Sequence, residues 1–123
     1  GYTLRISEEL IIPDPKKSIE DEALKNIFMP MGMIRHWYRV QVDGLIKHYN
    51  ISVGQPFYQL PDDFKRALLY GTGEQKIESE YYVRSTGEIK HRKAPFEGLV
   101  NVLERIYHNN PTDNFRKRLK IAW

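Results

Sequence analysis

The sequence contains no cysteine among its 123 residues. Disulfide bonds and thiolate metal sites are therefore excluded, and a cytoplasmic location is the simplest expectation because disulfides belong to oxidising compartments. No apolar run reaches the roughly 18 residues that a transmembrane helix needs, so we expect no membrane contact. The first residues also lack the charged-then-apolar pattern of a signal peptide.

Groups that could support catalysis or bind a metal are scattered along the chain. The four histidines lie far apart, without the short spacing of a metal site on one helix face. Gly71–Lys76 invites comparison with a phosphate-binding loop, but such a loop follows a strand and precedes a helix. Here a helix is expected before the glycines and a strand after them, so a helix-ending turn is the better interpretation. We expect no enzymatic activity and no cofactor in this chain.

The length fits one domain covering residues 1–123. We predict an α+β fold, in which a small helical domain of four to five helices carries one antiparallel β-hairpin. A short strand is expected at residues 10–12. Apolar spacing and capping residues predict helices over residues 18–28, 34–49, 61–70, 96–108 and 110–123. Gly44 weakens the second of these by about 1 kcal/mol relative to alanine.

Alternating apolar and polar residues predict the hairpin, with strands at 76–84 and 88–93. A three-residue loop, 85–87, fits because Gly87 supplies the positive φ of its last position. This register puts Ile89 on the apolar face of the first strand, whereas a two-residue turn would place it on the wrong face. It also pairs opposite charges across the outer face: Arg84 with Glu88 and Glu80 with Arg92.

Positive charge is concentrated towards the end of the chain. Residues 1–30 carry four basic and six acidic groups, whereas residues 84–123 carry nine basic and four acidic groups. Such asymmetry can steer a polyanion, and lysine and arginine clusters bind phosphates independently of base sequence. A solvated charged surface is the common alternative. The candidate phosphate-binding residues are Arg35, Arg39, Lys90, Arg92, Lys93, Arg116, Lys117, Arg118 and Lys120.

Aromatic side chains could add stacking contacts with bases, since eight tyrosines and two tryptophans are present. Most of them, including Trp37 and Tyr81, fall on stripes that we expect to face the core. Tyr82 is the exception, on the outer hairpin face beside Lys90.

Two short segments are the most distinctive parts of the sequence. Residues 68–73 read Leu-Leu-Tyr-Gly-Thr-Gly, and residues 94–98 read Ala-Pro-Phe-Glu-Gly and lead into a helix that contains Tyr107. Together with Ile-Ile-Pro-Asp-Pro at residues 11–15 and the two strands between them, they resemble the insertion domain of the UvrA family. UvrA is the DNA-binding ATPase subunit of the bacterial excinuclease that performs nucleotide excision repair. The resemblance covers nearly the whole chain, and residues 116–119 resemble the family's final helix.

The resemblance implies that this domain helps to clamp double-stranded DNA beside a lesion within a UvrA dimer. It places ATP hydrolysis, zinc binding and contact with UvrB in the full-length protein, outside this chain. The distinctive segments define the fold and are not DNA ligands by residue type. An alternative is a protein-interaction module that docks onto the rest of UvrA or onto another repair protein. An exposed apolar patch would support it, formed by Trp37, Met29, Met31 and Met33.

Overall fold

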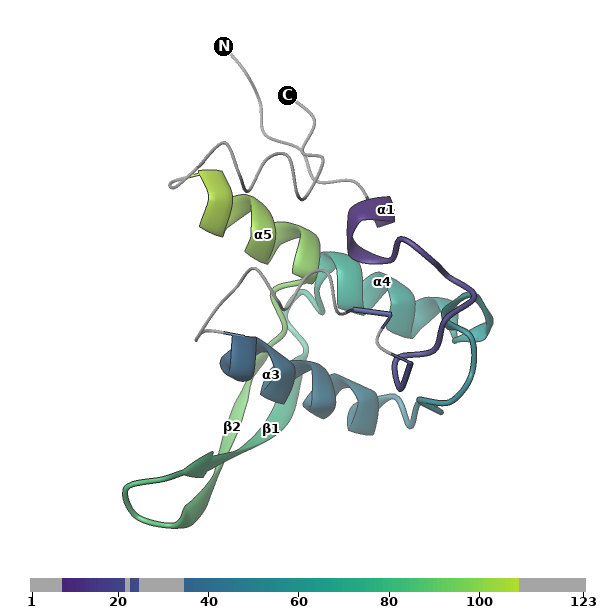
Figure 1. Ribbon diagram of the computed structural model, residues 1–123. Helices are drawn as coiled ribbons and strands as arrows, with labels where there is room; N and C mark the ends of the chain where they lie inside the picture. Colours follow the sequence, from purple (N-terminus) through teal and green to yellow (C-terminus); the bar gives the residue numbers. More distant parts are fainter. Residues whose placement is uncertain (1–7, 22, 25–34, 109–123) are drawn as a thin grey trace.

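The computed structural model describes residues 8–21, 23–24 and 35–108 (Figure 1). Its elements, in chain order, are α1 (Glu8–Ile11), α3 (Arg35–His48), a 3₁₀ turn η2 (Phe57–Gln59), α4 (Asp62–Tyr70), β1 (Lys76–Val83), β2 (Glu88–Pro95) and α5 (Leu99–His108). The prediction of a small α+β domain with one antiparallel hairpin is confirmed. The described residues contain three helices longer than one turn, fewer than the four to five expected. The predicted helix 110–123 lies outside these residues.

Three helices enclose the core and the hairpin extends away from them, with its loop at the far end (Figure 1). Side chains from each helix are fully buried, including Leu45 of α3, Phe64 and Leu68 of α4, and Leu99 and Leu103 of α5. Burial of each such side chain contributes about 1.5–3 kcal/mol. The core therefore forms a rigid base at one end of the hairpin. Within the described part of the chain, no helix is long and apolar enough to cross a membrane.

The base of the hairpin is held by a close contact between α3 and β1. A Cβ atom on Gly44 would lie 2.4 Å from the carbonyl oxygen of Glu78 and 2.8 Å from Oγ of Ser79. Real Cβ atoms do not approach backbone oxygens so closely, so only glycine fits at this crossing. The helix-weakening glycine noted in the sequence thus permits α3 to lie directly against the strand.

A second close contact joins the two distinctive segments. Gly71 ends α4 and Gly98 precedes α5, with φ values of 99° and 95°. A Cβ on Gly98 would lie 2.4 Å from the carbonyl carbon of Tyr70, so the two chain segments touch through their backbones. Thr72 fastens the contact: its amide donates to the Phe96 carbonyl at 3.0 Å, and its Oγ1 accepts from the Phe96 amide at 2.9 Å. The two segments that carry the resemblance therefore pack against each other at the base of the hairpin.

Arg105 links α5 to the segment before it and to α3. Its guanidinium donates to both carboxylate oxygens of Glu97 at 3.0 Å and to the hydroxyl of Tyr38 at 2.9 Å. These bonds, above all those to the Glu97 carboxylate, raise the pKa of Arg105 above its ordinary value. The bidentate geometry fixes the direction of the chain as it leaves β2 and enters α5.

Two predictions for the N-terminal part were wrong within the described residues. Residues 10–12 do not form a strand, because α1 closes a helical turn in which the Ile12 amide donates to the Glu8 carbonyl at 2.9 Å. Ser18 forms an isolated antiparallel β-bridge with Pro56, and residues 19–21 and 23–24 form turns instead of a helix. The predicted cap bond exists, from the Asp21 amide to Ser18 Oγ at 3.0 Å, but the Glu20 amide donates to the Val53 carbonyl. This distant pairing competes with a helical continuation. The other residues of the predicted helix, 22 and 25–28, lie outside the described residues.

The helix predicted from Phe96 begins later, at Leu99. Gly98 has a φ of 95°, which is incompatible with a right-handed helix, so the first turn cannot start before it. The helix over 34–49 is present as α3, and the helix over 61–70 is present as α4 with Pro61 as its cap.

The predicted strands of the hairpin are confirmed, but their predicted register was wrong by one residue. Val83 pairs with Glu88, so the loop contains four residues, 84–87. Gly87 does have positive φ, 72°, and its amide donates to the Val83 carbonyl at 2.8 Å. The longer loop turns Ile89 onto the outer face, where it lies opposite Tyr82. The expected pairs Arg84–Glu88 and Glu80–Arg92 do not form.

Candidate nucleic-acid interface

The observed register divides the basic residues of β2 between two faces of the hairpin. Lys90 and Arg92 pair with Tyr81 and Ser79, on the face that packs against the domain. His91 and Lys93 pair with Glu80 and Glu78, on the opposite face. The cluster Lys90–Lys93 read from the sequence is therefore a ribbon with cations on both sides.

Arg92 is held in place by aromatic rings. Its guanidinium carbon lies 5.0 Å from the ring centroid of Trp37 on α3, within the range of a cation–π contact. Tyr81 meets the same indole edge-on, with ring centroids 5.7 Å apart and planes at 79°. Trp37 is 39% exposed, so it is neither a core residue nor a free surface residue. This cluster couples α3 to the hairpin and fixes the position of one cation.

Three further cations are exposed in the loop and on β2. They are Arg84 in the loop and Lys90 and Lys93 on β2, and neither lysine forms an ion pair with another described residue. Arg84 was not among the predicted phosphate-binding residues, because the expected register assigned it to Glu88. Its position as a basic residue at the start of the hairpin loop was the signal that could have identified it.

Two of the three carboxylates on the hairpin, Glu78 and Glu80 of β1, lie close to basic groups. Glu78 Oε1 lies 3.1 Å from Nδ1 of His91, and Glu80 Oε1 lies 3.8 Å from the same atom. Lys47 of α3 adds a contact of 3.8 Å to Glu80. These groups are about half exposed or more, so the pairs add little stability. Lys47 offsets part of the negative charge of Glu80 that would repel a phosphate backbone.

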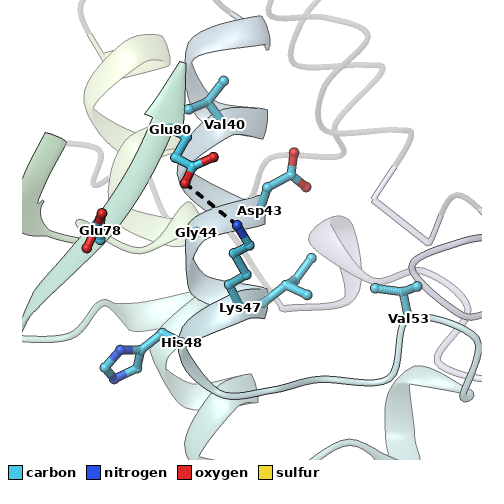
Figure 2. A pocket seen from close by; sticks show the side chains of 9 residues that line it. Val40, Asp43, Gly44, Lys47, His48, Val53, Glu78 and Glu80 are labelled. Carbon is cyan, nitrogen blue, oxygen red and sulfur yellow. Dashed lines mark ion pairs between the residues drawn. The ribbon is translucent and has the colours of Figure 1, made fainter. Parts of the chain in front are cut away.

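A hollow of about 730 Å³ lies between α3 and β1 (Figure 2). Its charged lining includes Asp43, Glu78 and Glu80, with Lys47 reaching towards Glu80. Partial burial raises the pKa of the Asp43 carboxyl, and the charge of nearby Arg39 lowers it by a smaller amount. Carboxylates thus outnumber lysines in this lining, which makes the hollow a poor phosphate site. Among the described residues, no group of three or more histidines and carboxylates could hold a metal ion.

The structure brings together part of the predicted site. Lys90, Arg92 and Lys93 share β2, and Arg39 is exposed on α3 beside Asp43. Arg35 is the first residue of α3. Four of the predicted residues lie outside the described chain: Arg116, Lys117, Arg118 and Lys120. Their role as phosphate-binding residues stays a prediction.

Comparisons with known proteins agree with this picture. The family described as "UvrA DNA-binding domain" matches residues 8–121. The UvrABC system protein A of Vibrio parahaemolyticus is 32% identical over 112 residues, which are 86% of this chain and 12% of that protein. The protein of the same name from Halalkalibacterium halodurans is 29% identical over 120 residues, 98% of this chain and again 12% of the relative. UvrA2 from Deinococcus radiodurans shares the fold, with a TM-score of 0.61 and 15% identity over 97% of this chain and 15% of that one.

Proposed function

This chain belongs to the UvrA DNA-binding domain family, and from that premise we propose that its hairpin binds double-stranded DNA during nucleotide excision repair. The proposed ligands are DNA phosphates, contacted by Lys90 and Lys93, with Arg92 as a cation held by Trp37. The observation that carries the proposal is the placement of these cations on a ribbon that extends away from the helical core. Such contacts give an affinity that depends on salt and little on base sequence.

The arrangement suits a phosphate backbone for a physical reason. Lys90 and Lys93 are exposed and have no competing carboxylate partner among the described residues, so no internal ion pair must be broken when they meet a phosphate. Glu78 and Glu80 are engaged by His91 and Lys47. Arg39, Arg35 and the basic residues 116–120 are proposed as additional contacts.

A salt titration with matched variants tests this proposal. A labelled duplex is titrated with wild type and with Lys90→Glu/Lys93→Glu at several salt concentrations below 200 mM. The control is Lys16→Glu/Lys17→Glu, which changes the net charge equally at two exposed lysines on the N-terminal segment. We expect the hairpin variant to weaken binding at least tenfold at low salt. Its plot of log affinity against log salt should be shallower by about 2, one for each lost phosphate contact.

An equal loss of affinity in the hairpin variant and the control would mean that net charge alone explains the effect, which would contradict a hairpin site. Absence of any salt-dependent binding by the wild type would contradict the proposed function as a whole. Circular dichroism spectra of the three proteins establish that each is folded before binding is compared.

The chain spans 12% of the length of the relatives described above, so its partners in a longer protein are also proposals. We propose that it works beside the rest of a UvrA dimer, with ATP hydrolysis, zinc binding and contact with UvrB carried by other parts of that protein. The partial exposure of Trp37 supports a second candidate, docking onto protein. Of the patch expected there, Met29, Met31 and Met33 lie outside the described residues. A protein pull-down that survives high salt and is lost in Trp37→Ala would favour this candidate over DNA binding.

A further inference from the structure

The outer face of the hairpin carries two large apolar side chains near its loop. Tyr82 and Ile89 pair directly across the strands and are 65% and 64% exposed. One more residue pair, Val83–Glu88, separates them from the loop. A single exposed apolar residue needs no explanation, but two facing each other at the end of a projecting ribbon form a small apolar surface.

Cations lie on both sides of this apolar pair along the ribbon. Arg84 lies in the loop, two residues after Tyr82, and Lys93 lies on the same face as Ile89, four residues further along β2. Glu80 and Glu78 share this face, opposite His91 and Lys93. Four residues of strand span about 13 Å. The major groove of double-stranded DNA is about 12 Å wide, is bordered by phosphate rows and admits a two-stranded ribbon. The span of four residues separates Lys93 from the apolar pair, so a ribbon that enters the groove loop first brings the pair to the base edges and leaves Lys93 near the phosphate border.

The size of the pair argues against a protein partner as its main occupant. A large aromatic side chain offers about 150–250 Å² of surface, so two side chains at two-thirds exposure present at most roughly 300 Å². A stable protein interface covers about 800 Å² on each partner. Without a broader apolar surround among the described residues, the pair is better suited to contacts inside a charged binding site than to a protein interface.

We infer that Tyr82 and Ile89 contact base edges or sugars inside a DNA groove while the neighbouring cations bind the phosphates. This inference rests on the proposed function and deepens it, because it adds a contact that salt does not weaken. Phosphate contacts release counterions and set the salt dependence of binding. An apolar contact releases none, so it raises affinity equally at every salt concentration.

The test compares Tyr82→Thr/Ile89→Thr with wild type and with Lys90→Glu/Lys93→Glu on one duplex across the same salt series. Threonine preserves strand propensity, and melting curves establish that the threonine variant is folded. We expect the threonine variant to lose roughly tenfold in affinity at all salt concentrations with an unchanged salt slope. Tyr82→Phe, which retains the ring and removes the hydroxyl, should bind like wild type.

The other outcomes refute the inference, and they distinguish failure of the apolar contact from failure of the whole hairpin site. If the threonine variant binds like wild type while the lysine variant is weakened, the apolar contact is refuted and the phosphate site stands. If neither variant differs from wild type, the hairpin site itself fails. Sedimentation of the free proteins provides a further arm: dimerisation of wild type that disappears in the threonine variant would assign the pair to contact with a second copy.

Discussion

Replacing Gly44 by alanine should destabilise this domain, although the same change stabilises most helices. In an unconstrained helix interior, alanine is favoured over glycine by about 1 kcal/mol. Here the new methyl group would lie 2.4 Å from the Glu78 carbonyl oxygen and 2.8 Å from Ser79 Oγ. To restore a separation of 3.0 Å from the carbonyl, α3 and β1 must move apart by at least about 0.6 Å.

The cost of that movement can be set against the gain in helix propensity. Forcing one extra methyl into a well-packed contact costs typically about 1–3 kcal/mol. The net effect of Gly44→Ala is therefore a loss of up to about 2 kcal/mol, or a fall in Tm of up to about 6–12 °C at roughly 3–6 °C per kcal/mol for a domain of this size. Because backbone and a buried serine form the obstacle, no flexible side chain can swing aside to relieve it.

Thermal unfolding followed by circular dichroism measures this difference, with Gly54→Ala as the matched control. A Cβ on Gly54 would meet one atom at 3.3 Å, the carboxylate oxygen of the exposed Glu20, which can move. The control should be neutral or stabilising by up to about 1 kcal/mol. A higher Tm for Gly44→Ala would refute the reasoning, because it would mean that α3 does not lie against β1 at the described distance.

Three further predictions concern single contacts. Arg105→Ala should lower the free energy of unfolding by roughly 1 kcal/mol in urea titrations. Arg105→Lys should lower it by less, because lysine keeps the charge but cannot reproduce the bidentate bond to Glu97. Equal stability of wild type and both variants would contradict a stabilising role for this contact. A double-mutant cycle with Trp37→Leu and Arg92→Leu should give a coupling energy of about 0.5–1 kcal/mol, and a value near zero would show that the cation–π contact adds nothing. Asp43→Asn should raise stability slightly at neutral pH, because burial raises the pKa of this carboxyl and so disfavours its ionised form in the folded protein. The gain should vanish as pH falls through the raised pKa to below the ordinary value of 3.8, where wild type is also neutral; a gain that persists there would have another cause.

Local patterns in the sequence were sufficient for the longer elements. Apolar spacing located α3 and α4, and alternation located β1, since these elements bury one face against the core; β2 was predicted as the hairpin partner of β1. The N-terminal segment was misjudged because its backbone is tied to a distant one: the Glu20 amide bonds to Val53, a contact that no local pattern encodes. The start of α5 was likewise predicted too early, because Gly98 packs its backbone against Tyr70 and Gly71, which lie far from it in the sequence.

The candidate site was predictable in composition but not in geometry. The sequence identified Lys90, Arg92 and Lys93 as cations of one strand. Their distribution between faces depended on the loop length, and a four-residue loop instead of three exchanged the faces of every β2 residue relative to β1. The three-residue loop predicts that Ile89 is buried, yet Ile89 is 64% exposed. An apolar residue that serves an outer surface cannot be distinguished by type from one that fills a core.

The central claim is that DNA contacts the hairpin, and the most direct measurement is the location of the contact by NMR. Uniformly ¹⁵N-labelled protein is titrated with a short duplex at low salt, and the changes in amide chemical shift are assigned along the chain. We predict that among residues 35–108 the largest changes fall on residues 81–93, with smaller ones near Trp37. Large changes confined to α4 and α5, with an unperturbed hairpin, would contradict the claim.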